Sequence, residues 1–210
     1  IPVGIASGIY LAEYASRRQQ AFLGLMVDLL SGTPSIVMGL FGFAMILLLR
    51  RTVASKAQTS LLLAAFCIAL LILPYLIRTT QAAIEGIPEH LHLLGPGIGL
   101  SKWQNIRHVL LPIASRGIFS GIILAIGRAS EDTAVILLTG VVAQAGIPRN
   151  LWDKFEALPF RIYYLAAEHR NASELEQGFG TALVLLCITG LLFLAAFFLQ
   201  RRAEKWWQTR

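Results

Sequence analysis

The feature that most constrains this chain is a set of long runs that contain no charged residue. These runs occupy residues 29–49, 59–77, 133–148 and 177–200. A helix needs about 20 mostly apolar residues to cross the hydrocarbon core of a bilayer. Of the 210 residues, 56% are hydrophobic and 14% are charged, whereas a soluble domain is about 25% charged. The chain is therefore predicted to be a polytopic membrane protein, which excludes the soluble enzyme classes.

The positions of the apolar stretches predict the helices. Spans or partial spans are expected over residues 1–12, 35–49, 59–77, 109–127 and 178–199. A break is expected at residues 32–34, Gly-Thr-Pro, because proline lacks a backbone donor and clashes with the preceding helical turn. Ile1 lies in an apolar stretch with no Met or charged segment before it. We therefore expect one transmembrane domain over residues 1–210, an all-α bundle of about five spans that is incomplete at its N-terminus.

The basic residues favour a membrane partner over nucleic acid. The net charge is +6, but Lys and Arg stand at the ends of apolar runs, where they anchor helices and set their orientation. We expect membrane lipid and no nucleic acid among the partners. Residues 201–207 combine three cations with two Trp, an interfacial pattern that we place in the cytoplasm. Alternation along the spans then places residues 78–108 in the cytoplasm and residues 50–58 outside.

Metal, cofactor and nucleotide sites are not indicated. Cys67 and Cys187 lie in the middle of apolar runs, which argues against a disulfide framework or a zinc site. His90, His92 and His108 lack HExxH spacing, and no GxxxxGK[ST] phosphate loop occurs. We expect no metal, no cofactor and no enzymatic activity. If transport is driven by ATP, the ATPase must be another chain.

Arg128, Glu131 and Asp132 form a charged cluster between two apolar stretches. A charge at the bilayer centre costs about 2.5–3.5 kcal/mol on insertion scales, so such residues usually face a water-filled path and pair with one another. Residues three and four apart share a face of a helix, so Arg128 can reach either acid. We predict that the three residues lie on a substrate path.

The same cluster can also be interpreted as part of an external loop. His108 and Arg128 are 20 residues apart, which is about 30 Å of helix and already a full span. Residues 133–148 would then have to cross the membrane again, which would leave the basic C-terminal tail outside, or would form an uncharged stretch that does not span the membrane. A long, broken or tilted span with the cluster inside it fits the sequence better.

An amphipathic stretch, residues 99–112, leads directly into the span at 109–127. It can be an interfacial helix that rests on lipid headgroups, with Trp103 as the anchor. It can also be a rigid lever, joined to a transmembrane helix, on which a cytoplasmic partner pushes. Periodicity does not separate the two interpretations.

At this stretch the sequence resembles a known family. Gly99, Ile106 and Leu111-Pro112 match the end of the "EAA" signature of ABC-importer permeases, G-x(6)-I-x(4)-LP. Further blocks resemble the phosphate-importer branch. They lie at residues 1–15, 32–40, 121–134 and 158–163. Thr133-Ala134 and the short tail after the last span resemble PstA-type subunits more than PstC-type subunits.

The resemblance implies a fold and partners. The fold is the type I importer permease (MetI-like) fold, in a prokaryotic inner membrane with the C-terminus in the cytoplasm. The partners are an ATP-binding subunit dimer, a PstC-type sister permease and an extracytoplasmic phosphate-binding protein, and the cargo is inorganic phosphate. Coupling to the ATPase falls on the loop around residues 78–108. The residues expected to act there are Glu85, Pro88, Glu89, Gly99, Lys102 and Trp103.

The chain departs from the family pattern at two places. Leu93, Leu94 and Gly95 occupy the E-A-A positions, so the glutamate of the loop is absent. Near the charged cluster the family reads G-R-A-x-G-E-T-A-P, and this chain has Asp132 in place of the glutamate and Glu131 in place of a glycine.

Alternative functions remain at this point. A permease for molybdate, sulfate or phosphonate would share the loop but not all the blocks. A channel or an ion-coupled secondary transporter would move its substrate without ATP or partner subunits. In a purely structural membrane subunit, Arg128 would be replaceable.

Overall fold

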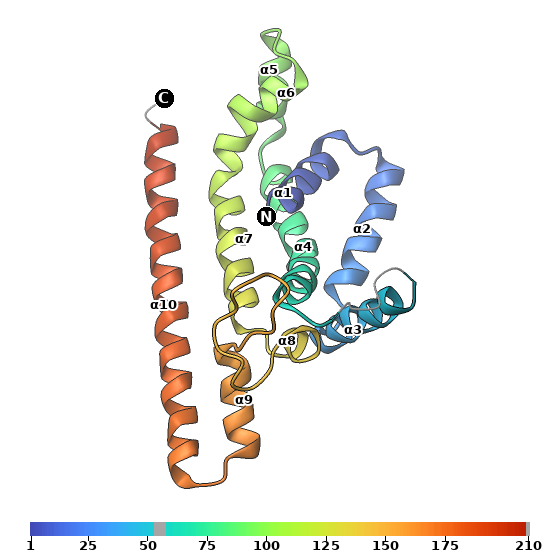
Figure 1. The fold of residues 1–210 in the computed structure, drawn as a ribbon. Coiled ribbons are helices and arrows are strands. Elements are labelled where there is room, and N and C mark those ends of the chain that lie inside the picture. The colour runs from blue at the N-terminus through green and yellow to red at the C-terminus, as the bar shows by residue number, and fades with distance from the viewer. Residues whose placement is uncertain (53–57, 209–210) are drawn as a thin grey trace. The chain divides into compact units, whose positions relative to one another are not determined.

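The computed structural model describes residues 1–52 and 58–208 (Figure 1). The helices, in chain order, are α1 Pro2–Ile9, η1 Tyr10–Tyr14, α2 Arg17–Ser31, α3 Ser35–Thr52, α4 Leu61–Glu85, α5 Glu89–Gly97, α6 Lys102–Asn105, η2 Ile106–Leu110, α7 Leu111–Glu131, α8 Ala134–Thr139, α9 Leu158–Glu168 and α10 Ala172–Gln208. The two η elements are single π-helical turns. Elsewhere in the described ranges, one isolated β-bridge joins Val141 and Phe155. The predicted all-α fold is confirmed.

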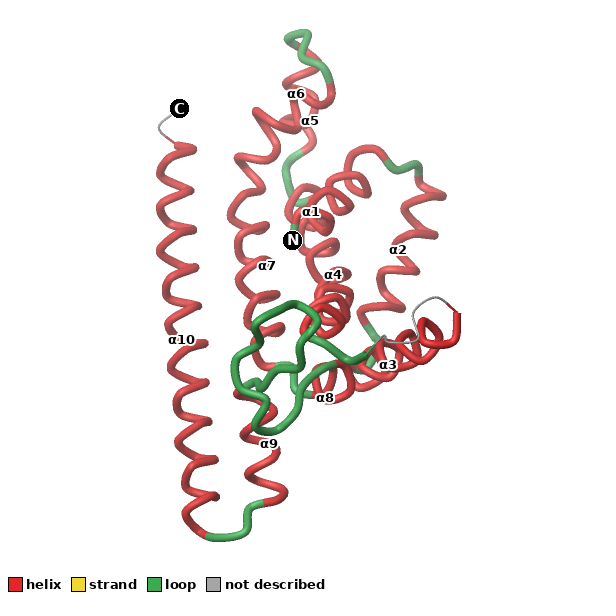
Figure 2. Tube along the Cα trace, viewed as in Figure 1, coloured by secondary structure: helices red, strands yellow, loops and turns green. Residues whose placement is uncertain are grey.

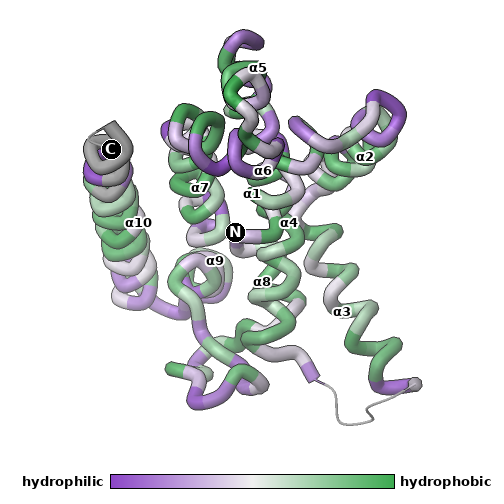
Figure 3. Tube along the Cα trace, turned by 90° about the horizontal axis from the view of Figure 1, so that it is seen from above, coloured by the Kyte–Doolittle hydropathy of each residue, from purple (hydrophilic) through white to green (hydrophobic). Residues whose placement is uncertain are grey.

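Four helical stretches among the described residues are long and apolar enough to cross a membrane. They are Ser35–Thr52, Leu61–Glu85, Lys102–Glu131 and Ala172–Arg202. Figure 3 shows the distribution along α10, which is hydrophobic through its middle turns and hydrophilic towards both ends. Within the chain itself only 6% of the apolar window of this last stretch is buried. Its apolar side chains therefore need lipid or another protein around them.

Local sequence signals explain several helix ends. α2 ends at Ser31 with Gly32 as its C-cap, and α3 begins at Ser35, so the predicted break before the second span is confirmed. Ser16 and Ser101 each begin a helix with a capping box, in which the serine and a glutamine three residues later satisfy each other's backbone N–H groups.

One helix end differs from the sequence prediction, and one proline lies inside a helix. α4 does not stop at Ile77 but continues to Glu85, because the Arg78 side chain finds partners inside the fold, as described below. Pro96 lies within α5, which runs through it and ends at Gly97. Proline cannot donate to the carbonyl of His92 one turn earlier, and that carbonyl instead accepts a hydrogen bond from the Asn105 side chain at 2.8 Å. α5 begins directly after Pro88, which is its N-cap.

The described chain divides into two compact units, and each is considered by itself. The first comprises Ile1–Gly32, Ile72–Ile126 and the part of α10 that starts at Phe193. Its main core joins α1, the end of α4, η2 and the first half of α7. The buried residues there are Ile9, Ile84, Ile87, Ile106, Leu110, Ala114 and Ile118. A smaller core of Leu11, Val27 and Ile77 joins η1, α2 and α4.

The second unit comprises Thr33–Leu71 and Gly127–Leu192. Its cores are built where α8 and the start of α4 meet α3 and the loop between α8 and α9 (Figure 2). That loop also completes the N-terminus of α4: the carbonyls of Asp153 and Leu151 accept hydrogen bonds from the first two N–H groups of the helix, at 2.9 and 2.8 Å. These donors have no partner within a helix, so the loop is held by backbone bonds.

Gly42 on α3 is predicted to tolerate no side chain. A Cβ atom there would lie 2.5 Å from Cys67 Sγ and 2.8 Å from Thr139 Cγ2, whereas a Cβ atom at Gly190 on α10 would have no neighbour within 4 Å. Gly to Ala raises helix propensity by about 1 kcal/mol at either position, but overpacking costs about 1–3 kcal/mol. Gly42→Ala should lower the thermal unfolding midpoint in detergent and Gly190→Ala should not. Equal midpoints would show that α3 does not pack as described.

Candidate functional site

The charged cluster lies where the long helix α7 ends. Arg128 is in the last turn of α7, and Glu131 is the final residue of that helix. Both side chains are exposed within this chain, and Asp132 is half-buried. A cation in the last turn is favoured by the partial negative charge at a helix C-terminus. The chain therefore presents Arg128 at a helix break, not in the middle of a continuous span.

Asp132 has a structural partner of its own. Its Oδ1 atom accepts a hydrogen bond from the backbone N–H of Val135 at 2.8 Å. Asp132 stands one residue before Thr133, the N-cap of α8, and its carboxylate satisfies a backbone donor in the first turn of that helix. Pairing of Arg128 with Asp132 along one helix face requires a helix that continues to Asp132, but α7 ends at Glu131. Within the described residues, Arg128 has no ion pair or hydrogen bond to either acid.

Packing of α8 against α3 holds the cluster in place. At Gly39 the two backbones approach so closely that a Cβ atom would lie 3.0 Å from the carbonyl oxygen of Ala134. Val135 is fully buried in the same contact. Thr139, at the end of α8, is buried too, and its carbonyl accepts a hydrogen bond from the N–H of Ser60 at 2.9 Å. Asp132 is thus bonded to a helix that is fixed in the fold, whereas the Arg128 guanidinium has no hydrogen bond or ion pair within the described residues.

The predicted coupling segment forms a helical hairpin of α5 and α6. The turn between them uses Gly99 with φ of +84°, a left-handed conformation that glycine adopts without strain. Asn105 is buried, and its side chain lies against Gly95 so closely that a Cβ atom there would lie 2.3 Å from Asn105 Oδ1. Together with the bond from Asn105 to the His92 carbonyl, this contact joins α5 to α6.

The hairpin presents an apolar surface. Its large exposed side chains are Leu93, Leu94, Ile98 and Trp103, with exposed fractions between 47% and 71%. Two of them, Leu93 and Leu94, occupy the E-A-A positions of the family pattern. All six predicted coupling residues are exposed. These are Glu85, Pro88, Glu89, Gly99, Lys102 and Trp103. Glu85 already accepts hydrogen bonds from Gln20 and Gln81, each at 2.8 Å, so its carboxylate also serves the fold.

A contact that the sequence analysis missed fastens the hairpin to η1. On η1, the Oε1 atom of Glu13 lies 2.8 Å from His92 Nδ1, and its Oε2 atom lies 3.9 Å from Lys102 Nζ. The Lys102 ammonium also donates to the Glu13 carbonyl and lies 4.8 Å from the centre of the Tyr14 ring. Three separate segments therefore meet at one carboxylate. Glu13 stands 79 residues before His92, and no local pattern signals a contact at that distance.

A second missed contact joins α2 to α4. Arg78 donates to both carboxylate oxygens of Asp28, at 2.8 and 2.6 Å, and to the carbonyl of Gly24 at 2.8 Å. A fourth bond goes to Gln81 Oε1 at 2.9 Å. The Asp28 carboxylate thus accepts a two-pronged bond from the Arg78 guanidinium. The pairing explains how α4 carries a cation beyond its apolar run.

Comparison with known families decides the class of the protein. Residues 4–208 match the family described as "Binding-protein-dependent transport system inner membrane component". The chain belongs to this family. It is therefore an inner-membrane component of the permease class, as the signature at residues 99–112 suggested.

The similar curated proteins are permeases. PstA 1, the phosphate transport system permease protein of Mycobacterium tuberculosis (strain ATCC 25618 / H37Rv), is 31% identical over 93% of this chain and 62% of its own length. PstA of Haemophilus influenzae is 31% identical over 96% of this chain and 69% of its own length. YqgI of Bacillus subtilis, a probable ABC transporter permease, is 32% identical over 78% and 54%. The chain thus spans about 62% of the mycobacterial relative that it matches.

The fold matches that of a solved importer. A chain of the MetNI methionine ABC transporter in an inward-facing conformation superposes with a TM-score of 0.72, over 96% of this chain and 86% of the other, at 18% identity. A second crystal form gives a TM-score of 0.68. At this identity the likeness shows the fold alone, and the expected MetI-like permease fold is confirmed.

Proposed function

We propose that this chain is a transmembrane permease subunit of an ATP-driven importer of inorganic phosphate. The observation that carries the proposal is the similarity to PstA proteins at about 31% identity over nearly the whole chain. In this proposal residues 1–210 act as one transmembrane domain in the inner membrane. The segment around residues 78–108 and the C-terminus lie in the cytoplasm, in line with the basic tail.

Arg128 is the proposed substrate contact. A phosphate dianion in a low-dielectric path needs a compensating cation, and a guanidinium offers a planar fork of donors that matches an oxyanion. Its exposure and its lack of a partner in the described chain support this role. Glu131 is exposed and has no hydrogen bond or ion pair within the described residues, so its carboxylate is available to accept a hydrogen bond from the P–OH group of hydrogen phosphate. Asp132, which is bonded to the first turn of α8, contributes to the field at the site and to its geometry.

The hairpin of α5 and α6 is the proposed contact with a separate ATPase dimer. An exposed apolar patch on a projecting helical hairpin is typical of a protein-binding surface, and the contacts of Glu13 and Asn105 make the hairpin rigid enough to transmit a push. The further partners in this proposal are a PstC-type sister permease and an extracytoplasmic phosphate-binding protein. Hydrolysis of ATP takes place on the ATPase chains, and this chain is not an enzyme.

Reconstituted transport tests the proposal. The chain, its sister permease, the ATPase and the binding protein are incorporated into liposomes, and uptake of labelled phosphate is measured with and without ATP. We expect ATP-dependent uptake that excess unlabelled phosphate suppresses and excess sulfate does not, because sulfate has no O–H group to donate a hydrogen bond to the carboxylate. Uptake without ATP would indicate a channel or secondary transporter. Uptake of molybdate, sulfate or phosphonate in place of phosphate would show that phosphate is not the cargo. The assignment of the chain as a permease subunit would still hold.

A further inference from the structure

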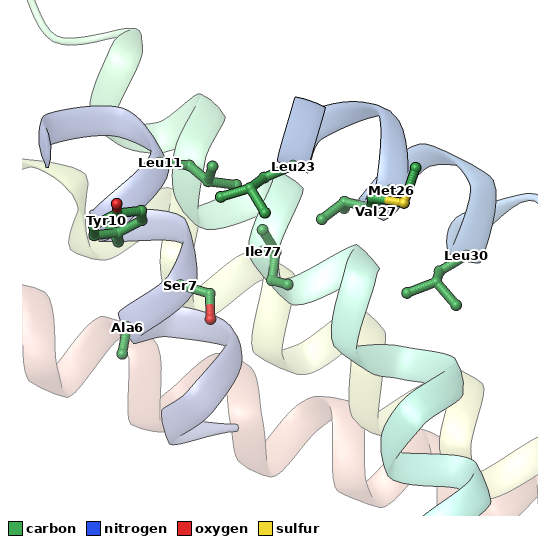
Figure 4. A pocket seen from close by; sticks show the side chains of 9 residues that line it. All are labelled: Ala6, Ser7, Tyr10, Leu11, Leu23, Met26, Val27, Leu30 and Ile77. Atoms are coloured by element: carbon green, nitrogen blue, oxygen red, sulfur yellow. The ribbon is translucent and has the colours of Figure 1, made fainter. Parts of the chain in front are cut away.

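An apolar groove runs between α1, η1 and α2 in the first compact unit (Figure 4). Its volume is about 420 Å³, and it is lined by Ala6, Ser7, Tyr10, Leu11, Leu23, Met26, Val27, Leu30 and Ile77. Apart from the hydroxyl groups of Ser7 and Tyr10, every lining side chain is apolar. A groove of this size is in the range of sites that hold small organic ligands.

The helix that forms one wall of the groove is itself surrounded by apolar side chains. On α2, Phe22, Leu25 and Leu29 do not line the groove and are 62%, 54% and 61% exposed. An element with apolar side chains on several faces belongs in lipid or inside a protein assembly. A hydrocarbon chain is therefore a chemically matched occupant of the groove.

Two cations stand at the start of α2, before its groove-lining residues. Arg17 and Arg18 open α2 and are exposed, and within the described residues neither has an ion pair or a hydrogen bond from its guanidinium. Leu23, the first of those residues, is about 8 Å along the helix from Arg18. The nearby acids are occupied, because Glu13 holds His92 and Lys102, and Glu85 holds Gln20 and Gln81.

An aromatic pair precedes these cations in the chain. The rings of Tyr10 and Tyr14 stack with their centres 6.4 Å apart, and both are nearly half exposed. Tyr10 lines the groove, and Tyr14 lies one turn further towards Arg17. Tyrosine is enriched where a membrane helix meets the headgroup layer, so the groove at Tyr10 has the side chains of an interface.

We propose that the groove binds one anionic phospholipid, with an acyl chain along α2 and the headgroup phosphate on Arg17 and Arg18. A basic site next to an apolar cleft between membrane helices selects acidic lipids, and a guanidinium recognises phosphate with paired donors. The lipid would stabilise the contact between α2 and η1. It lies in the same unit as Glu13, which holds the α5–α6 hairpin, and is independent of the cargo at Arg128.

Native mass spectrometry of the purified transporter tests this site. The chain is isolated with its partner subunits in detergent and incubated with equal amounts of phosphatidylglycerol and phosphatidylcholine. We expect one phosphatidylglycerol for each copy of the chain, with at least a five-fold preference over phosphatidylcholine. Arg17→Gln combined with Arg18→Gln should reduce that preference below two-fold. Arg107→Gln, which removes another exposed cation of the same unit that has no partner for its guanidinium within the described residues, should leave it unchanged.

A second pair of variants tests the groove itself. Ala6→Phe fills the cavity and should abolish retention of both lipids, whereas Leu29→Phe, outside the groove on α2, should have no effect. Equal retention of the two lipids by the unmodified transporter would overturn the proposal without any variant, and so would retention that survives Ala6→Phe.

A photoreactive amino acid at position 26 should label lipid. Labelling of a neighbouring subunit instead would show that protein fills the groove. Loss of phosphate uptake in the cargo experiment bears on none of these results.

Discussion

Replacing Arg128 by glutamine should reduce ATP-dependent phosphate uptake at least ten-fold without loss of the assembled transporter. The substitution keeps a hydrogen-bonding side chain of similar reach and removes the positive charge. A hydrogen bond to a charged group contributes about 1.5–3 kcal/mol, which corresponds to roughly 10- to 100-fold in an equilibrium or a rate. Because Arg128 has no partner within the described chain, its loss leaves no acid unpaired and should not affect folding. Uptake at subsaturating phosphate is the measurement.

Matched variants separate charge from position. Arg149→Gln removes an exposed arginine from the same unit, in the loop after α8, and should leave uptake within two-fold of normal. Arg128→Lys keeps the charge but loses the two-pronged geometry. Its uptake rate should therefore lie between those of Arg128→Gln and Arg149→Gln. If Arg128→Gln disappears from the membrane, the residue is structural. If it transports normally, the substrate path lies elsewhere.

The expected defect is in flux and not in tight binding. A path that held phosphate strongly would not release it, which is why conduction uses weak sites in series. Arg128 is suited to a weak site because it is exposed at a helix end, where water still shares its donors. The half-saturating phosphate concentration should therefore change less than the maximal uptake rate, since affinity in such systems can reside on the binding protein.

The apolar runs and Pro34 were sufficient to predict the helical class, the break before α3 and the approximate positions of the long helices. The helix ends were less predictable, because they depend on distant partners. α4 extends past Ile77 because Arg78 bonds to Asp28 and Gly24 of α2. α5 passes through Pro96 because Asn105 satisfies the carbonyl that proline cannot. Neither partner is visible from hydropathy along the chain.

The candidate site was also predicted in part. The charge pattern predicts that Arg128, Glu131 and Asp132 form a cluster in a long, broken or tilted span, and the structure places them where α7 ends and just before α8 begins. Their mutual geometry was not predictable from helical spacing, because the helix ends before Asp132 and that carboxylate is bonded to the first turn of α8. The Glu13 contact with His92 was missed for a similar reason. Glu13 was noted only as part of the block at residues 1–15, and a carboxylate gives no local sign of a partner far along the chain.

Gly95→Ala should uncouple the transporter, because it places a methyl group where the two helices of the hairpin touch. The added Cβ atom would lie 2.3 Å from Oδ1, 2.5 Å from Cγ and 2.7 Å from Cβ of Asn105. Rotation of the amide cannot relieve the last of these contacts, so α5 must move away from α6. The bond from Asn105 to the His92 carbonyl would break with it. We expect binding-protein-stimulated ATP hydrolysis, and the uptake linked to it, to fall about ten-fold, measured together in proteoliposomes.

Gly97→Ala supplies the control within the same helix. The chemical change is identical, both residues lie in α5, and a Cβ atom at Gly97 would have no neighbour within 4 Å. Its hydrolysis and uptake should stay within two-fold of normal. Gly95→Ala should still assemble, because the main core of its unit is built from α1, α4, η2 and α7 and does not include Gly95. Normal coupling in Gly95→Ala would mean that the α5–α6 contact transmits no force, and the contact with the ATPase would then have to be sought outside the hairpin.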